Sequence, residues 1–451
     1  MIRIAIDGPG GAGKSSVAKL LAARLGILYV DTGALYRAIG MYMLEHGTDP
    51  ADTAGVIARL PDVKLSLRFE HGKQLLLLNG KDVGDAIRRP EISMAASRVS
   101  AIPEVRTFLL DTQRKIARKN SVIMDGRDIG TVILPDADLK IFLIAQPEAR
   151  AKRRYEELTA KGVTTTYEAV LSEMQERDHN DATRATAPCV KAPDAILLDN
   201  SGITLEETAD KIEEELAWVK ARNKSRRAYM FYRAVLAPFF RFFNRVHVTG
   251  QENIPPKGGL LVCCNHIAVR DVFMLGLVVP RQIRFIGKKE LFAIPVVGSM
   301  IRSLGAIRLD RGGADVGAIR TAVELARRGE AVAIFPQGHR YPGVNPADTK
   351  PKNGAALIAS HAGCSVLPIC ICVKNNKYGF FRRVDMKIGK VLTLEDLGLT
   401  TPGADKYGAA TDRIFGDILD LGGFLPSAYR QKLSYNPITQ ADENSAEDTE
   451  R

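Results

Sequence analysis

The feature that most constrains this chain is a glycine-rich segment near its start. It follows the apolar run 2–6 and leads into an amphipathic segment at 17–25, an order typical of a strand, a tight turn and a helix. Such a turn aims backbone N–H groups at a polyphosphate, and the helix dipole adds to the attraction. Lys14 can reach the β- and γ-phosphates, and the Ser15 hydroxyl is placed for Mg²⁺. The predicted phosphate-binding residues are Gly8, Pro9, Gly10, Gly11, Ala12, Gly13, Lys14, Ser15 and Ser16.

The distribution of charge divides the chain into two halves. Its 451 residues are too many for one ordinary hydrophobic core, so two or three domains are expected. Residues 1–225 hold 32 Lys and Arg against 32 Asp and Glu, whereas residues 226–425 hold 28 against 15. The excess of positive charge in the second half predicts a polyanionic partner, either nucleic acid or anionic lipid.

Cysteine spacing and hydropathy indicate the cellular compartment. The six cysteines form no CxxC pair and no secreted-protein framework, so we expect reduced thiols and no metal cluster. The printed sequence enters its first strand at once, and no apolar run reaches the ~18 residues of a membrane-spanning helix. We therefore expect a cytoplasmic protein.

The first half alternates between apolar strands and helical segments. Strands are predicted at 27–30, 121–124 and 139–145, and helices at 91–101 and 104–119. This alternation is typical of a doubly wound parallel sheet. A hairpin is predicted within 63–83 as a small insertion.

Several motifs in this half resemble the bacterial cytidylate kinase family over about residues 1–220. They are the phosphate loop, the turn 31–37, Ala95-Ala96-Ser97, the segment 125–128 and the segment 176–184. The resemblance implies a P-loop nucleoside-monophosphate-kinase fold with an insertion at about 60–85 and a lid at about 150–186. It also implies CMP or dCMP as substrate, with ATP and Mg²⁺. The implied CMP-binding residues are Thr32, Tyr36, Arg37, Ser97, Arg106, Arg127, Asp128, Arg177, Asp181 and Arg184.

Base chemistry supports the implied roles. Cytosine offers acceptors at O2 and N3 and a donor at its amine, which suit Arg106 with Ser97 and the Asp128 carboxylate. The resemblance gives Arg37, Arg127 and Arg184 the phosphates, and the transfer itself to Lys14, Arg127 and Arg184. It gives Arg177 and Asp181 the ribose. Asn180 and Ala182 stand where the family often has arginine, so rate or affinity is expected to differ. A kinase for another small molecule is the alternative.

The junction between the halves is a charged stretch. Residues 206–222 are predicted to form a helix that closes a first domain, 1–222, and residues 223–228 to form a polar linker. Residues 229–243 are far richer in aromatics than the chain average of 6% and contain interspersed arginines. This pattern suits a helix lying in a membrane interface, although a helix packed on its own domain is the alternative.

Four spaced motifs follow, and together they resemble the glycerolipid acyltransferase family over residues 229–425. They lie at 260–271, 304–311, 331–340 and 366–369. The resemblance implies a second α/β domain that moves an acyl group from an acyl-CoA or acyl carrier protein thioester to a lysophospholipid such as 1-acylglycerol-3-phosphate. It makes His266 the general base and Asp271 its orienting partner, roles that suit a neutral imidazole near pH 7. It also implies Arg311 and Arg340 as contacts of the acceptor phosphate and Gly338 as an oxyanion donor.

Two positions depart from that family's pattern. Gln337 and His339 stand where most members have glutamate and threonine. Because His266, Asp271 and both arginines are present, we expect an active acyltransferase. The alternative is a cytidylate kinase tethered to a membrane by a catalytically weak lipid-binding module.

The excess of positive charge in the second half is consistent with the resemblance to the acyltransferase family. An anionic membrane surface accounts for the charge, the aromatic helix and the acyltransferase motifs together. No module that enters a nucleic-acid groove or stacks bases is visible, so no nucleic-acid partner is expected. We therefore expect peripheral membrane attachment through this half. The polar residues 426–451 are predicted to be a disordered tail.

Overall fold

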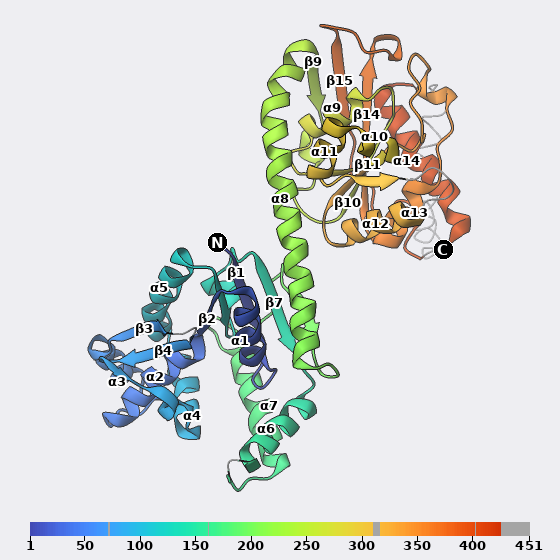
Figure 1. Cartoon of the computed structure of the whole chain (residues 1–451). Coiled ribbons are helices and arrows are strands. Elements are labelled where there is room, and N and C mark those ends of the chain that lie inside the picture. Colours follow the sequence, from blue (N-terminus) through green and yellow to red (C-terminus); the bar gives the residue numbers. More distant parts are fainter. Residues whose placement is uncertain (71–72, 161, 310–315, 402, 425–451) are drawn as a thin grey trace, which may run out of the picture. The chain divides into compact units, whose positions relative to one another are not determined.

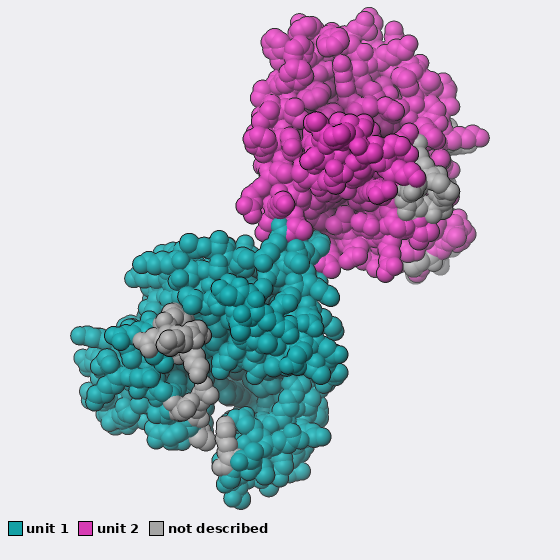
Figure 2. Space-filling view, viewed as in Figure 1, with its two compact units in different colours: residues 1–220 teal, residues 221–451 magenta. Residues whose placement is uncertain are grey.

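The computed structural model describes residues 1–70, 73–160, 162–309, 316–401 and 403–424. The chain forms two compact units, residues 1–220 and 221–451, coloured separately in Figure 2. The predicted tail lies outside the described residues. Among the described helices, none combines the length and the apolar character needed to cross a bilayer.

The first unit is built on a parallel sheet with the strand order β2-β6-β1-β7-β8. Its strands are β1 (Arg3–Asp7), β2 (Leu28–Asp31), β6 (Val122–Asp125), β7 (Leu139–Ile144) and β8 (Ile196–Asp199). Its helices are α1 (Lys14–Leu25), α2 (Thr32–Glu45), α3 (Thr53–Arg59), α4 (Pro90–Val99), α5 (Pro103–Lys119), α6 (Pro147–Ala160) and α7 (Tyr167–Thr183). The parallel register brings the carboxyl ends of β1, β2 and β6 to one edge, so Asp7, Asp31 and Asp125 reach the same end of the sheet.

The predicted hairpin insertion is present as a small antiparallel sheet. It consists of β3 (Leu65–Glu70), β4 (Lys73–Leu78) and β5 (Lys81–Asp82). Leu76 and Leu78 on β4 are buried in the same cluster as Leu35 and Ile39 of α2. The apolar side chains that alternate along the hairpin therefore pack it against the helices of the first unit.

The second unit contains a mixed sheet with the strand order β12-β11-β13-β10-β14-β15-β9. Its strands are β9 (Arg245–Thr249), β10 (Leu260–Cys264), β11 (Ile283–Lys288), β12 (Ile307–Leu309), β13 (Ala331–Ile334), β14 (Ser365–Val373) and β15 (Arg383–Ile388). Only the pairing of β14 with β15 is antiparallel among the described strands of this sheet. Its helices are α9 (Arg270–Val278), α10 (Lys289–Ala293), α11 (Pro295–Ser303), α12 (Val316–Arg327), α13 (Gly354–Ala362) and α14 (Tyr407–Gly422). The strands β10, which is fully buried, and β13, which is buried except for the half-buried Ile334, lie between two apolar clusters, one on each face of the sheet.

One helix corrects the predicted linker. Residues 223–228 are helical, because they lie inside α8 (Leu205–Phe243), the long helix in Figure 1. Residues 205–237 contain neither proline nor glycine, so nothing in the chain ends the helix there. Within the second unit, Ser225 is buried and its hydroxyl accepts hydrogen bonds from Arg284 Nη1 at 2.7 Å and Gln282 Nε2 at 3.2 Å. The basic residues of 223–228 are thus part of a helix rather than a flexible joint.

Candidate active sites

The glycine-rich segment forms a turn between β1 and α1. Gly8 and Gly13 have φ values of +141° and +84°, which side-chain-bearing residues rarely adopt. A Cβ atom at Gly8 would also collide with the carbonyl oxygen of Leu143 on β7. Gly13 caps the N-terminus of α1, so the turn presents the start of this helix to a ligand.

Lys14 and Ser15 occupy the first turn of α1. The Lys14 ammonium donates to the carbonyl oxygen of Pro9 at 2.6 Å, and the Ser15 hydroxyl donates to Asp125 Oδ2 at 2.6 Å. Burial, followed by the charge of Arg127, lowers the pKa of Lys14 to about 7. Burial also raises the pKa of Asp125, and Tyr29 donates its hydroxyl to Asp125 Oδ1 at 3.0 Å. A serine hydroxyl beside a buried carboxylate is an oxygen donor set that fits Mg²⁺.

A carboxylate from the lid region lies on the phosphate loop. Asp178 of α7 accepts a hydrogen bond from the backbone N–H of Gly10 at 3.2 Å. Arg150 of α6 lies 2.6 Å from Asp178 and donates to the carbonyl oxygen of Gly10 at 2.7 Å. The predicted lid, 150–186, thus contributes two residues that contact the loop directly.

A cavity of about 250 Å³ opens beside this loop. It is lined by all of the predicted CMP-binding residues and also by Asp31, Asp125, Gly10 and Lys14. Of the predicted residues, Thr32, Arg106, Asp128 and Asp181 are buried. A neighbouring cavity of about 950 Å³ is lined by Gly11, Gly13, Ser16 and three arginines of α6, namely Arg150, Arg153 and Arg154. Two adjoining spaces that share Lys14 and Ser15 suit two phosphorylated ligands.

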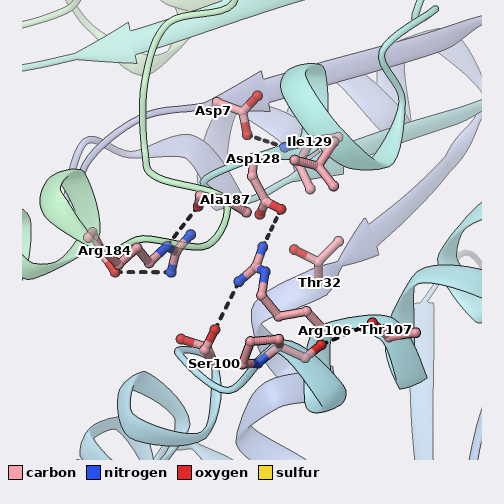
Figure 3. Close-up of polar contacts among 12 residues, drawn as sticks. Asp7, Thr32, Ser100, Arg106, Thr107, Asp128, Ile129, Arg184 and Ala187 are labelled. Atoms are coloured by element: carbon pink, nitrogen blue, oxygen red, sulfur yellow. Dashed lines mark hydrogen bonds and ion pairs between the residues drawn. The ribbon is translucent and has the colours of Figure 1, made fainter.

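One wall of the smaller cavity carries the predicted base-reading residues. Arg106 of α5 is ion-paired with Asp128 and donates to the carbonyl oxygen of Ser100 at 3.0 Å (Figure 3). Asp7 holds the segment after Asp128, because its carboxylate accepts from the N–H groups of Ile129 and Gly130, both at 2.7 Å. Burial raises the pKa of Asp7 to about 6. Ser97 lines the same cavity.

The same cavity also carries positive charge. Arg127 lies 2.7 Å from Asp181, and Arg184 lies 3.5 Å from the same carboxylate. In addition, Arg37 pairs with Asp31 at 2.8 Å. Arg184 Nη2 and Arg37 Nε are buried without a hydrogen-bond partner among the described residues. Buried guanidinium groups with unused donors indicate a site for an anion such as a phosphate.

In the second unit, His266 and Asp271 form a hydrogen-bonded pair between β10 and α9. Nδ1 of His266 lies 2.7 Å from Asp271 Oδ2, and the same oxygen accepts from the N–H groups of Ile267 and Ala268 at 2.6 and 2.8 Å. Asp271 is fully buried, and the His266 ring stacks on Phe335 with a centroid distance of 3.9 Å. Because Nδ1 is engaged, Nε2 is the ring nitrogen left for a reacting group.

Buried amides support the backbone of His266. Gln337 accepts from the N–H of His266 at 2.6 Å and donates to the Thr349 hydroxyl at 2.7 Å. Asn265 exchanges two hydrogen bonds with the backbone of Ile371 on β14, at 2.8 and 2.9 Å. Gln337 thus holds the histidine segment in place by a neutral contact.

An apolar cavity of about 630 Å³ opens beside His266. It is lined by one face of α8, by α9, β11 and α11, and at its polar end by His266, His339, Arg340 and Lys352. The residues of α8 that line this cavity are Tyr229, Tyr232, Arg233, Leu236 and Phe240. A histidine at the mouth of a mostly apolar cavity suits a ligand with a long hydrocarbon chain and a reactive polar end.

The predicted contacts of the acyl acceptor have different outcomes. Arg340 lines the cavity as expected, whereas Arg311 lies outside the described residues. The backbone N–H of Gly338 donates to the carbonyl oxygen of Phe335 at 2.9 Å within a turn. This donor is therefore already engaged, and its predicted role toward an oxyanion is not supported by the geometry.

The first unit has the features of a P-loop kinase: a glycine-rich loop between a strand and a helix, on a parallel sheet, beside an arginine-lined cavity. The family model described as cytidylate kinase matches residues 4–217. The cytidylate kinase of Fervidobacterium nodosum is 50% identical over 210 residues, which cover 47% of this chain and 94% of that protein. The cytidylate kinase of Caldicellulosiruptor bescii is 48% identical over 213 residues, which again cover 94% of the relative. The chain belongs to the cytidylate kinase family.

The second unit matches a different family. The family model described as acyltransferase matches residues 245–372, which include the His266–Asp271 pair and Arg340. The crystal structure of a 1-acyl-sn-glycerophosphate acyltransferase from Thermotoga maritima is 25% identical, with a TM-score of 0.33, and the match covers 48% of this chain and 82% of that one. The cytidylate kinase family identified from the sequence motifs is confirmed, and the second unit contains a segment that matches an acyltransferase family model.

Several residues of these sites received no role from the sequence, and four of them make specific side-chain contacts. Asp125 accepts from both Ser15 and Tyr29, Asp178 contacts the phosphate loop, and Tyr378 donates its hydroxyl to Asp271 Oδ1 at 2.7 Å. The position of Asp125 at the end of a buried strand, three residues before Asp128, was a usable signal. Tyr378 is 107 residues from Asp271 in the sequence, and no local pattern predicts their contact.

Proposed function

We propose that the first unit phosphorylates CMP and dCMP with ATP. The observation that carries the proposal is that Arg106 and Asp128 line the same cavity as Arg37, Arg127 and Arg184, next to the phosphate loop. Uracil would present an acceptor to Asp128 and leave that buried carboxylate unsatisfied, so the site favours cytosine. The identity to cytidylate kinases supports the same substrate.

The transfer needs positioning and charge neutralisation rather than a covalent nucleophile. A phosphate oxygen of CMP attacks the γ-phosphorus of ATP, a new P–O bond forms, and the bond to the β-phosphate oxygen breaks to release ADP. Lys14 and Arg127 line the side of the cavity next to the phosphate loop, and Arg37 and Arg184 bring donors for the acceptor phosphate. Mg²⁺, which Ser15 and Asp125 would hold, supplies further neutralisation of phosphate charge.

A nucleotide panel tests this proposal. We expect CMP and dCMP to be phosphorylated by the intact chain with kcat/KM at least about 100-fold above that for UMP or AMP. Arg184→Ala is expected to abolish most activity, and Arg118→Ala, an exposed arginine on α5, to leave it unchanged. A preference for UMP or AMP would show that this unit is a kinase for another substrate.

We propose that the second unit transfers an acyl group from a thioester to the hydroxyl of a lysophospholipid, with 1-acylglycerol-3-phosphate as the best candidate. The observation that carries the proposal is the His266–Asp271 pair at the mouth of the apolar cavity. Nε2 of His266 takes the proton of the acceptor hydroxyl as its oxygen attacks the thioester carbonyl. The C–S bond then breaks, and the proton passes from the imidazolium to the leaving thiolate. Arg340 and Lys352 provide positive charge for an acceptor phosphate.

The aromatic part of α8 supports an attachment to anionic membranes in this proposal. One face of the helix lines the apolar cavity, and the other exposes Phe231, Phe239 and Phe242 at helical spacing. The loop between β14 and β15 adds Phe380 and Phe381; Phe242 and Phe380 are 69% and 70% exposed. The N–H of Phe381 donates to the carbonyl oxygen of Phe243 at 2.8 Å, so loop and helix present one aromatic surface, consisting of these five phenylalanines. Arg241 and Arg382 beside it suit lipid phosphates.

The acyltransferase proposal is tested by transfer of a labelled acyl group to lysophosphatidate, with acyl-CoA and acyl carrier protein thioesters supplied separately. We expect turnover by the intact chain and its loss, by at least about 1,000-fold, in His266→Ala. His361→Ala, a change in an exposed histidine of α13, is the matched control. If a wider panel of lysolipids also gave no turnover while CMP was still phosphorylated, the unit would be a lipid-binding tether for the kinase.

Membrane attachment is tested by sedimentation with phosphatidylcholine vesicles, with and without phosphatidylglycerol. We expect binding to need the anionic lipid and to weaken by at least about tenfold when Phe380 and Phe381 are both changed to Ser. Val316→Ser removes an exposed apolar side chain elsewhere in the same unit and is expected to have no effect. Equal binding by the double variant would exclude this surface.

A further inference from the structure

The carboxylate of Asp271 has donors on both oxygens. Oδ2 accepts from His266 Nδ1 and from the N–H groups of Ile267 and Ala268, all within its own turn. Oδ1 accepts from the hydroxyl of Tyr378 at 2.7 Å. Tyr378 is therefore the contact that ties this carboxylate to a distant part of the second unit.

The tyrosine is held by the segment between β14 and β15. Asn375 and Asn376 adopt φ values of +56° and +49°, a conformation that asparagine tolerates better than most residues. The carbonyl oxygen of Asn376 accepts from the N–H of Gly343 at 2.7 Å. The guanidinium of Arg270 lies 5.8 Å from the centre of the Tyr378 ring. Burial and the charge of Asp271 raise the pKa of Tyr378, so its hydroxyl stays protonated and can only donate to the carboxylate.

We propose that Tyr378 is a positioning residue of the proposed acyl-transfer site, which fixes the Asp271 carboxylate so that Oδ2 stays against Nδ1 of His266. This inference rests on the proposed acyltransferase function and adds a third member to its two-residue pair. A carboxylate with a donor on Oδ1 and three on Oδ2 cannot rotate about its Cβ–Cγ bond without losing a hydrogen bond to a charged group.

The Tyr378 hydroxyl also affects how strongly the Asp271 carboxylate stabilises a positive charge on the His266 ring. A donor on Oδ1 withdraws part of that charge, so its removal leaves Asp271 a stronger partner for the imidazolium. The pKa of His266 is then expected to rise, and the acidic limb of the pH profile to move to higher pH. Among the described residues, Arg270 and Cys264 are further titratable or charged groups near the pair, and the adjoining cavity is lined by Arg233, Lys288, His339, Arg340 and Lys352. Tyr378→Phe leaves all of these in place.

The experiment compares Tyr378→Phe with Tyr407→Phe in the full chain. Tyr407 is buried in α14, and none of the described residues of that helix lines the apolar cavity. For Tyr378→Phe we expect kcat of acyl transfer to fall about 10- to 100-fold, as for a lost hydrogen bond to a charged group, with KM nearly unchanged. The acidic limb of the kcat profile should shift upward. Tyr407→Phe should change neither.

A second readout does not depend on acyl transfer. The pKa of His266 is measured by NMR in protein with labelled histidines, and His266→Gln identifies its signal among the 7 histidines. We expect a higher pKa in Tyr378→Phe than in the unchanged protein. An unchanged pKa, or a kcat and acidic limb within error of the control, would overturn the role of Tyr378. Absence of acyl transfer in the unchanged protein would instead overturn the proposed function, and the NMR shift would still decide whether Tyr378 acts through Asp271.

Discussion

Asp178 and Gly10 are joined by a hydrogen bond of 3.2 Å, which places a carboxylate of α7 on a phosphate-loop N–H. The same carboxylate pairs with Arg150 at 2.6 Å. A polyphosphate bound by this loop needs that N–H and is repelled by the carboxylate. In this structure the Asp178 carboxylate therefore occupies an N–H group that a bound polyphosphate would use.

The first prediction follows from this contact. Asp178→Asn removes the negative charge and weakens the contact with Gly10, so ATP should bind up to about tenfold more tightly. Calorimetric titration of the intact chain with ATP and Mg²⁺ measures the effect. Glu173→Gln, a change at an exposed residue of the same helix, is the control and should leave the affinity unchanged. Weaker ATP binding in Asp178→Asn would contradict this prediction and would mean that Asp178 stabilises the ATP complex by holding Arg150 in place.

The second prediction concerns selection of the base. Asp128→Asn places an amide donor where the carboxylate can face the amine of cytosine, and it removes the partner of the buried Arg106. We expect the ratio of kcat/KM for CMP to that for UMP to fall about 10- to 100-fold, because UMP gains a donor and CMP loses a charged acceptor. Initial rates with both nucleotides measure it. Asp111→Asn on the exposed face of α5 should keep the ratio, and a constant ratio in Asp128→Asn would remove Asp128 from base reading.

The third prediction uses the raised pKa of Asp7. Its value of about 6 lies above the usual 3.8, so the folded protein holds this proton more tightly than the unfolded chain. The resulting stability is fully present below the unfolded pKa and is lost as pH rises through about 6. Asp7→Asn does not titrate. The free energy of unfolding of the unchanged protein should therefore fall relative to that of Asp7→Asn by up to about 3 kcal/mol between pH 4 and pH 7.

Urea unfolding at the two pH values provides the measurement. Trp218, the single tryptophan of the chain, packs against the apolar core of the first unit, so its fluorescence reports on that unit. Asp62→Asn is the control, because Asp62 is exposed and should show no such pH dependence. A difference between Asp7→Asn and the unchanged protein that stays constant from pH 4 to pH 7 would contradict the prediction.

The sequence was most informative where the chemistry is local. The phosphate loop lies between one strand and the next helix, and the hairpin within 63–83 has a strong alternating pattern, so both were predicted correctly. His266 and Asp271 are five residues apart, and the turn that joins them is all that their contact needs.

The features that were missed depend on distant residues. The polar, basic run 223–228 predicts a linker, but it contains no helix breaker and continues α8 in the structure. Tertiary contacts at Ser225 support the helix there, and they come from residues 57 and 59 positions away. The contacts of Asp178 and Tyr378 likewise join segments 168 and 107 residues apart. Such pairings are fixed by the fold and leave no periodic trace in the sequence.

The fourth prediction concerns the departure at Gln337. Gln337 stands where most members of the resembled acyltransferase family have glutamate, yet here the amide makes a hydrogen bond with each of its two partners. Its oxygen accepts from the N–H of His266, and its NH₂ group donates to the Thr349 hydroxyl at 2.7 Å. That hydroxyl already donates its single proton to the carbonyl oxygen of Pro346 at 2.7 Å. An ionised glutamate would leave Thr349 with two acceptors and one proton.

Gln337→Glu is therefore expected to destabilise the second unit by about 1–3 kcal/mol at pH 8 rather than to improve the enzyme, because the residue is 2% exposed and one acceptor loses its donor. At pH 5 the loss should shrink, since a protonated glutamate regains a donor for Thr349. Thermal unfolding at both pH values measures this, with acyl transfer followed in parallel. In the Thr349→Val background, Gln337→Glu should cost less, because the competing hydroxyl is gone. A Gln337→Glu protein that is as stable as the parent and transfers acyl groups faster would contradict this prediction. It would show that the Gln337 amide does not stabilise the site and lowers its activity.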